Sequence, residues 1–279
     1  MRQLTVVIVT YNAKQYLLKC LEYLGKASEG MDVEVIVVDN ASADGSEEAV
    51  RDAYPNVEYI YSTENLGFAK ANNIAIRKAS GKYVLLLNPD VFISEDTLRR
   101  VLEFAESKPD MGALGVRMIN GDGVFLPESK RNKPTLWNSF CKITGLASLM
   151  PENRLFASYY NVTLSENETG YTSVLAGAFM LLNKAALGDT SLLCEDYFMY
   201  GEDIDLSVSV LDAGYRNYYC GDVTVVHLKG KCTDKASPKI IEAFYKSMDI
   251  YYRRHSKNPI AKAIVRFITK ATIRAKAGA

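Results

Sequence analysis

The sequence predicts an α/β fold in which a mostly parallel, Rossmann-like sheet carries helices on both faces. Short β-branched runs alternate with helical patterns through residues 4–105, and this alternation is typical of parallel βαβ units. The 279-residue chain is 48% hydrophobic and 24% charged, as ordinary globular proteins are. A chain of this length can bury a full core as one large domain or as two smaller lobes.

Each expected strand is a short apolar run, and each expected helix repeats apolar residues every three or four positions. The expected strands are 4–10, 33–39, 57–61 and 83–87. The expected helices are 16–24, 46–54, 69–79 and 94–105, with Ser94 as the N-cap of the last. Another helix is expected to begin near Glu202 and end at Gly214, and the apolar run before His227 is a candidate strand.

Polar residues follow three of the expected strands, at positions 10–12, 39–40 and 88–90. Any one of these groups can be turn chemistry or a helix cap. Ligands of parallel sheets gather at the carboxyl ends of the strands, so the three groups together indicate a ligand site. No glycine-rich phosphate loop follows the first strand. A bound nucleotide would need a cation, a metal or side-chain amides for its phosphates.

An acidic cluster lies further along the chain, with five acids within eleven residues: Glu195, Asp196, Glu202, Asp203 and Asp205. Crowded carboxylates repel one another and raise each other's pKa. Such a group usually serves a base, a metal or a cationic partner.

Five cysteines, without a C-x-x-C pair, argue against a disulfide framework and a zinc knuckle and favour a reducing cytoplasm. The start of the chain shows no signal-peptide pattern, and no apolar run approaches the ~18 residues of a membrane span.

The C-terminal segment has its own charge balance, because residues 253–279 hold eight cations and no acid while the preceding residues carry a net charge of −8. Residues 258–277 have the pattern of a basic amphipathic helix. The apolar positions are Ile260, Ile264, Phe267, Ile268 and Ala271, and the recurring cations are Lys262, Arg266, Lys270 and Arg274. Such a helix can lie on an anionic membrane or pack on its own domain. Nucleic-acid binding is not expected, since no basic patch is interleaved with aromatics.

Seven motifs in sequence carry a resemblance to a known family. They are V-T-Y-N near the N-terminus, V-V-D-N at 37–40, E-N-L-G-F-A-K-A-N-N at 64–73, L-L-N-P-D-V at 86–91, G-A-F-M-L at 177–181, Y-F-M-Y-G-E-D-I-D-L at 197–206, and His227. Across residues 3–230 the chain resembles family 2 inverting glycosyltransferases of the GT-A fold. The branch it resembles is the rhamnosyltransferase-like one that builds bacterial surface polysaccharides.

The resemblance implies a set of donor-binding residues. Thr10, Tyr11 and Asn12 fall where the first strand meets the nucleotide, and Asp39 falls where a carboxylate holds the base or ribose. The segment beside the nucleotide and its phosphates contributes Asn65, Gly67, Lys70 and Asn73. Asn88-Pro89-Asp90 occupies the family's D-x-D position, with an asparagine in place of the first aspartate.

Because Asn88 is neutral, Asp90 is the only carboxylate of that motif able to bind a divalent ion. His227 matches a histidine that completes the metal site in related enzymes, and the expected cofactor is Mn²⁺ or Mg²⁺. An imidazole ligand favours Mn²⁺. The alternative for His227 is a buried, hydrogen-bonded histidine.

Asp203 aligns with the family's general base, and its neighbours Glu202 and Asp205 are expected to raise its proton affinity. A helix cap is the alternative for Asp203. Glu202 and Asp205 are expected on the acceptor side, with helix capping as the open alternative for both.

The resemblance divides the chain into a nucleotide-sugar-binding half (1–119), an acceptor-binding and catalytic half (120–228) and a helical, basic tail (229–279). Aromatic residues accumulate in residues 120–172, where they suit either acceptor contacts or packing. The favoured reaction moves L-rhamnose from dTDP-L-rhamnose to a lipid-linked saccharide. The alternatives are a UDP-galactofuranose or UDP-hexose transferase and a non-catalytic nucleotide-sugar-binding scaffold. The expected location is the inner face of the cell membrane, with the tail on anionic lipid.

Overall fold

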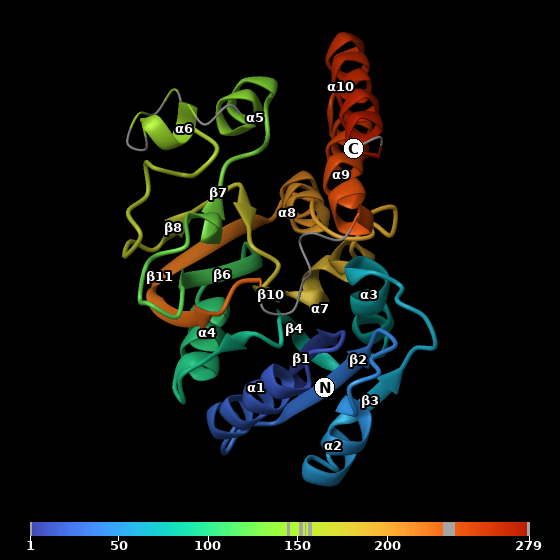
Figure 1. Cartoon of the computed structure of the whole chain (residues 1–279). Coiled ribbons are helices and arrows are strands. Elements are labelled where there is room, and N and C mark those ends of the chain that lie inside the picture. The colour runs from blue at the N-terminus through green and yellow to red at the C-terminus, as the bar shows by residue number, and fades with distance from the viewer. Residues whose placement is uncertain are drawn as a thin grey trace.

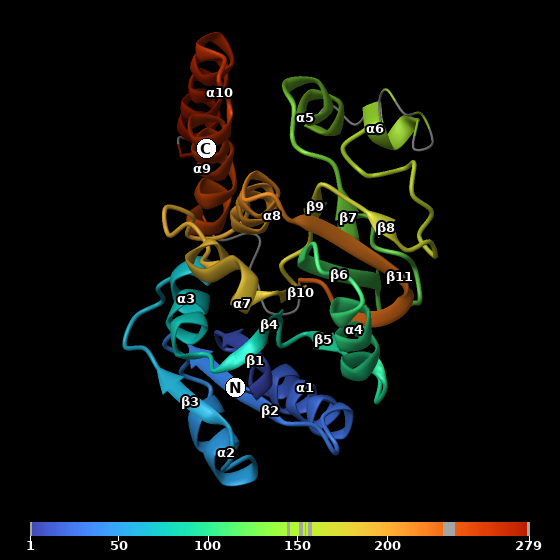
Figure 2. The ribbon, with the colours of Figure 1, turned by 180° about the vertical axis from the view of Figure 1, so that it is seen from behind.

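The computed structural model describes residues 2–143, 146–150, 153, 155, 158–230 and 238–277. Within this part, a nine-stranded sheet runs through the molecule and is flanked by helices (Figure 1 and Figure 2). Its strands are β1 (Arg2–Thr10), β2 (Val33–Asp39), β3 (Glu58–Tyr61), β4 (Gly81–Leu87), β5 (Val91–Phe92), β6 (Met111–Ile119), β8 (Gly170–Tyr171), β10 (Phe179–Leu182) and β11 (Arg216–His227). A second sheet pairs β7 (Lys130–Arg131) with β9 (Val174–Leu175).

Helices connect and cover these strands. They are α1 (Lys14–Ala27), α2 (Ser46–Ala53), α3 (Phe68–Lys78), α4 (Thr97–Glu106), α5 (Leu136–Ile143), α6 (Leu146–Leu149), α7 (Lys184–Leu187), α8 (Glu202–Asp212), α9 (Pro238–His255) and α10 (Pro259–Ala277). Two 3₁₀ turns span Pro127–Ser129 and Gly188–Ser191.

The large sheet has the strand order β3-β2-β1-β4-β10-β6-β11-β5, and β8 pairs with β11. β1 to β4 are parallel, as the β-branched runs predict. β10 is antiparallel to both β4 and β6, and thereby joins the N-terminal strands to the second half of the chain. The short β5 closes the far edge, antiparallel to the end of β11.

Two apolar cores lie on opposite faces of the sheet. Leu17 and Leu21 of α1 pack with Leu98 and Val101 of α4 on one face. On the other face, the core includes α3, α7 and α8, where Leu206 of α8 is buried. Both faces of the sheet are therefore buried, which explains why its strands are almost uninterrupted apolar runs.

The expected strands and helices are confirmed, with shifts of a few residues at their ends. The expectation that Ser94 caps the next helix is wrong. Asp96 is the N-cap of α4, and the Ser94 hydroxyl bonds the Asp96 carboxylate at 2.8 Å instead. Cys20, Cys141, Cys194 and Cys220 are free thiols, and Cys232 lies outside the described residues.

The expected C-terminal helix is α10, which lies beside α9 (Figure 1). Ala261 and Val265 of α10 pack with Tyr251 and Tyr252 of α9 and with Val208 of α8. The larger apolar side chains of α10 remain outside this contact. No helix of the described segments is long and apolar enough to cross a bilayer.

Candidate active site

Two hydrogen bonds donated by backbone amides bring the 88–90 turn and the start of α8 close together. The Asn88 amide donates to the Ala178 carbonyl at 2.9 Å, next to the β4/β10 pairing. The amide of the adjacent Gly177 donates to Oδ2 of Asp203 at 3.2 Å. Gly177 leaves little room, since a Cβ there would lie 3.2 Å from the Asp203 Cβ. The turn at the D-x-D position and the candidate base therefore meet across one short loop.

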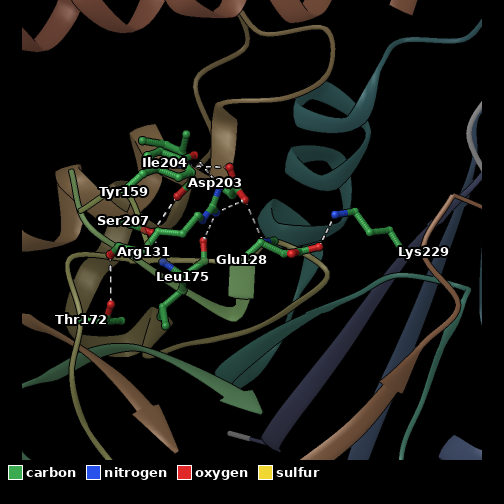
Figure 3. A network of polar contacts seen from close by, with 10 residues as sticks. Glu128, Arg131, Tyr159, Thr172, Leu175, Asp203, Ile204, Ser207 and Lys229 are labelled. Atoms are coloured by element: carbon green, nitrogen blue, oxygen red, sulfur yellow. Dashed lines mark hydrogen bonds and ion pairs between the residues drawn. The ribbon is translucent and has the colours of Figure 1, made fainter. Parts of the chain in front are cut away.

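Asp203 is paired with Arg131, a residue that sequence reasoning missed (Figure 3). Nη2 of Arg131 lies 2.6 Å from Oδ2 of Asp203 and also donates to the Leu175 carbonyl at 2.7 Å. Both side chains are largely buried, at 9% and 16% exposed. Burial opposes the charge on Arg131, but the Asp203 carboxylate outweighs it and raises the pKa of the guanidinium. The partners are 72 positions apart in the chain, so no local sequence pattern indicates this pair.

The three acids at the start of α8 have three different environments. Glu202 is buried, and Oε2 has no hydrogen-bond partner among the described residues. Burial, and then repulsion from Asp203, raise the pKa of Glu202 to about 8. Asp205 is also buried, but hydrogen bonds from His255 and Arg254 outweigh that burial and lower the pKa of this carboxyl.

These environments revise the expected roles of the acidic cluster. The carboxyl with the raised pKa is Glu202, whereas Asp203 has Arg131 as a direct counter-charge. Asp205 is only 2% exposed and lies against α9, so its position argues against contact with an acceptor. Asp203 is not the N-cap of α8, because Gly201 occupies that position, but Oδ1 of Asp203 accepts the Ile204 amide in the first turn.

The β5/β11 edge brings Asp90 to His227. His227 is paired with Val91, and the Leu228 amide donates to the Asp90 carbonyl at 2.9 Å. Nε2 of His227 lies 3.4 Å from Oδ1 of Asp90. Both residues are buried, and among the described residues neither Oδ1 of Asp90 nor Nδ1 of His227 has a hydrogen-bond partner. Buried polar atoms left in this way point to a ligand.

The polar residues after β1 lie around the neighbouring end of the sheet. Oγ1 of Thr10 is buried without a partner in the described structure, and Tyr11 is 45% exposed. Asn12 has a left-handed φ of 48°, and its side chain accepts the Ala43 amide at 2.8 Å. A non-glycine residue in this region usually marks a constrained, functional turn.

Asp39 is fully buried at the end of β2. Its carboxylate accepts the Ser42 amide at 2.7 Å and a short hydrogen bond from the Tyr59 hydroxyl. Ala41, two residues after Asp39, has a left-handed φ of 69°. Asp39 thus holds the loop that faces the end of β1, and the expected contact with a base or ribose would have to share its carboxylate.

The 64–73 segment is fastened to the chain before α8. Oδ1 of Asn65 accepts the Gly67 amide at 3.0 Å, and the Phe68 amide donates to the Phe198 carbonyl at 2.8 Å. A side chain at Gly67 could not fit, because its Cβ would lie 2.3 Å from the Phe198 oxygen and φ is 81°. Lys70 is exposed.

The expectation that Asn73 binds the donor is not supported by its position. Asn73 is 1% exposed, and its amide group bonds the Leu193 backbone at 2.8 and 2.9 Å and the Glu195 carboxylate at 2.9 Å. Arg77 also binds Glu195. Asn73 and Glu195 therefore join α3 to the segment before α8, which gives Glu195 a structural role.

The structure brings the two predicted metal ligands, Asp90 and His227, side by side. No group of three or more histidine, cysteine or acidic residues that could hold a metal occurs in the described part of the chain. An ion bound by Asp90 and His227 would therefore need ligands from substrate and water, which is a usual arrangement for Mg²⁺ with phosphates.

Comparison with known proteins gives a family match over most of this architecture. The family model "Glycosyl transferase family 2" matches residues 5–189. An N-acetylglucosaminyl-diphospho-decaprenol L-rhamnosyltransferase of Mycobacterium tuberculosis is 32% identical over 267 residues, which cover 91% of this chain and 85% of the relative. A rhamnosyltransferase of Escherichia coli K12 is 27% identical over 234 residues, which cover 80% and 82% of the two chains.

Among solved structures, a mannosyltransferase of Pyrobaculum calidifontis in complex with GDP-mannose and Mn²⁺ has a similar fold. Its TM-score is 0.62 at 22% identity, over 98% of this chain and 70% of that one.

Proposed function

The chain belongs to glycosyl transferase family 2, and on that premise we propose that it transfers L-rhamnose from dTDP-L-rhamnose to a hydroxyl of a lipid-linked saccharide, with inversion at the sugar. The chain is thus a glycosyltransferase, and its fold is the expected GT-A fold. The single observation that carries the mechanism is the position of Asp203, bonded to Gly177 beside the turn that holds Asp90. The two rhamnosyltransferase relatives, one named for a decaprenol-linked acceptor, support the choice of substrates.

Asp203 is the group we assign to proton transfer. Its Oδ2 holds Arg131 and Gly177, whereas Oδ1 accepts only the Ile204 amide among the described residues. Oδ1 is therefore the atom left to accept the proton of the acceptor hydroxyl. The hydroxyl oxygen forms a bond to the anomeric carbon as the bond from that carbon to the phosphate oxygen breaks. The nucleoside diphosphate leaves with the bonding electron pair, and this single displacement inverts the centre.

Arg131 orients the base in this scheme. It fixes Oδ2 from the side of β7, and its contact with the Leu175 carbonyl fixes the guanidinium in turn. A base held on one oxygen presents the other in a constant direction, which is how positioning lowers a barrier. The nearby ion pair of Glu128 with Lys229 extends the charged network toward the end of β11 (Figure 3).

A divalent ion fits Asp90 and His227. Oδ1 of Asp90 has no hydrogen-bond partner among the described residues and lies 3.4 Å from Nε2 of His227, so the two residues offer one carboxylate oxygen and one imidazole nitrogen, a donor set that suits Mn²⁺. When bound, the ion would neutralise charge on the leaving diphosphate. The Mn²⁺ bound to the Pyrobaculum mannosyltransferase, which shares the fold, supports this cofactor. Thr10 and the exposed Tyr11 lie at the end of a neighbouring strand, where we place the nucleotide.

We also propose that α10 contacts an anionic membrane surface. Ile260, Ile264, Phe267 and Ile268 are exposed, with Phe267 at 75%, while the smaller Ala261 and Val265 make the contact with α9. A helix packed only on its own domain would bury its larger apolar side chains. Exposed apolar residues beside regularly spaced cations suit the boundary between lipid head groups and acyl chains. Peripheral binding would bring a lipid-linked acceptor to the enzyme.

A donor screen tests the proposed reaction. The full chain is incubated with dTDP-L-rhamnose, UDP-galactofuranose and UDP-hexoses in the presence of Mn²⁺ or Mg²⁺, and released nucleoside diphosphate is measured. We expect release from dTDP-L-rhamnose and faster release with a lipid-linked saccharide. Preferential release from a UDP-sugar would overturn the donor, and binding without release from any donor would favour the scaffold alternative.

The Asp203→Asn variant tests the base in the same assay. It keeps the shape of the side chain and removes the basic carboxylate, so turnover should fall ~10²–10⁴-fold. Donor affinity measured by calorimetry should stay within about threefold, because the change lies outside the proposed nucleotide contacts. Full turnover in this variant would refute the base assignment.

A further inference from the structure

The end of α9 is fastened to α8 by polar contacts to the buried Asp205 carboxylate; we call this group, formed by Asp205, Arg254 and His255, the Asp205 anchor. Oδ1 of Asp205 lies 2.8 Å from Nε of Arg254 and 2.6 Å from Nε2 of His255. Oδ2 of Asp205 accepts a second bond from Arg254 at 3.3 Å. Some 50 residues of chain separate the two sides of the anchor, so its formation requires α9 to be docked.

The anchor is enclosed by other contacts. The Tyr197 hydroxyl donates to Oδ1 of Asp205 at 3.3 Å, and the His255 ring lies against Tyr251, with 5.0 Å between centroids. The Asp205 side chain is 2% exposed. A carboxylate removed from water to this extent needs its cationic partners, because an unpaired buried charge is strongly disfavoured.

Asp205 follows the proposed base by two residues in the first turn of α8. That turn has no side-chain cap, and its N-cap Gly201 has a left-handed φ of 89°. Gly201 itself faces α9, since a Cβ there would lie 3.1 Å from the Ser247 Cβ. The start of α8 is thus held on one side by Arg131 through Asp203 and on the other by α9 through Asp205.

We propose that Asp205, Arg254 and His255 are positioning residues, through which docked α9 fixes the first turn of α8 and so aims Asp203 at the acceptor hydroxyl. This inference rests on the proposed role of Asp203 as base. The C-terminal helices would then have two roles. α10 exposes apolar residues, and α9, which packs beside it, orders the first turn of α8. Loss of the anchor should slow transfer while leaving intact the proposed nucleotide site at the ends of β1 and β4, whose residues the anchor does not contact in the described structure.

Arg253 provides a matched control for Arg254. The two residues are adjacent on α9 and similarly exposed, at 53% and 42%, but Arg253 pairs with Asp249 and Asp196 at the surface whereas Arg254 pairs with the buried Asp205. Arg253→Gln removes the same charge from the same helix without touching Asp205. Arg254→Lys and His255→Gln are conservative variants that keep a cation and a hydrogen-bonding nitrogen, respectively.

The test uses the full chain and measures turnover at saturating donor together with donor affinity. Arg254→Gln and His255→Ala should lower turnover ~10-fold or more, in line with the sensitivity of catalysis to small misplacements. Donor affinity should remain within about twofold, Arg253→Gln should match the unmodified protein, and the conservative variants should recover much of the loss. Equal turnover in Arg254→Gln and Arg253→Gln would overturn the proposal, and so would a parallel loss of donor affinity and turnover.

A double variant asks whether the anchor acts through the base. On the Asp203→Asn background, Arg254→Gln should cause little further loss, since two changes that disable the same step are not additive. A full additional loss would contradict positioning through Asp203.

Hydrogen exchange separates this inference from the proposed function. Amide protons in the first turn of α8 should exchange faster in Arg254→Gln than in Arg253→Gln. If the unmodified protein releases no nucleoside diphosphate, the proposed function fails, yet the exchange comparison still decides whether the anchor orders α8. Equal protection in both variants would refute that ordering.

Discussion

The three acids in the first turn of α8 differ in whether a cation lies beside them. Asp203 has Arg131, Asp205 has Arg254 and His255, and Glu202 has no cation within hydrogen-bonding distance in the described structure. Three like charges on one helical turn repel one another. Two of them remain compatible with burial because cations from β7 and α9 reach them. The third is stabilised by keeping its proton.

Glu202 gives a pH prediction for stability. Because its pKa is raised to about 8 in the folded protein, folded Glu202 retains a proton that the unfolded chain has released between about pH 5 and 8. Its contribution is therefore fully present at acid pH and is lost as pH rises through about 8. The slope is at most about 1.4 kcal/mol per pH unit over this window.

Urea unfolding of the unmodified chain and of Glu202→Gln at several pH values measures this effect. The unmodified chain should lose stability relative to the variant as the pH rises from about 5.5 to about 8.5. Parallel pH dependence of the two proteins would show that Glu202 is ionised in the fold. A glutamine at this position is a suitable control because it keeps the size of the side chain and cannot titrate.

The expected donor-site residues fall into two groups, those that contact other parts of the protein and those with a polar atom left without a partner among the described residues. Gly67 and Asn73 hold the 64–73 segment against Phe198 and Leu193. These residues of the motif therefore have a structural role, whether or not they also contact a ligand. The Asx turn of Asn65 has the same structural meaning. Thr10 and Asp90 are different, because each keeps a buried oxygen without a partner in the described chain.

At the scale of elements, antiparallel pairing at two places assembles the site. β10 joins β4 to β6, and its preceding loop bonds both Asn88 and Asp203. β5 joins the end of β11 and sets Asp90 beside His227. Neither pairing follows from the regular alternation of the first hundred residues, which predicts parallel neighbours.

The β5/β11 edge carries a metal prediction. In Asp90→Ala and His227→Ala, donor affinity should fall and should respond less to Mn²⁺ than in the unmodified protein, because a divalent ion would lose one of its two protein ligands. Calorimetric donor titrations with and without Mn²⁺ measure this coupling. Arg100→Gln is the control. Arg100 lies on α4, and its side chain pairs with Asp96 at the surface. An unchanged Mn²⁺ response in both site variants would remove the metal role from these residues.

On the whole molecule, cations and exposed apolar side chains are concentrated together on the C-terminal helix α10. α10 holds a row of cations and four exposed large apolar side chains, and the helix stands beside α9 at one end of the molecule (Figure 2). Because α9 also anchors α8, this end combines the proposed surface contact with the proposed catalytic helix.

Membrane binding is tested with full-length variants, so that the Asp205 anchor stays in place. Ile264→Glu with Phe267→Glu should reduce cosedimentation with vesicles of phosphatidylglycerol by ~10-fold or more, since it removes apolar insertion and adds negative charge. Val124→Glu, at an exposed apolar position in a loop, is the control. Equal binding of the α10 double variant and the control would contradict membrane contact through α10.

We could predict four features from the amino-acid sequence alone: the family, the order of the first strands and helices, the positions of the motif residues and the amphipathic pattern of α10. These features depend on residues close together in the chain, where apolar periodicity and turn residues have local effects. The folded chain was needed to identify the partners of the acidic cluster, the structural role of Asn73 and the exposed face of α10. The physical reason is that burial and counter-charge come from distant segments, as Arg131 and Arg254 show, and a carboxyl's protonation and role depend on both.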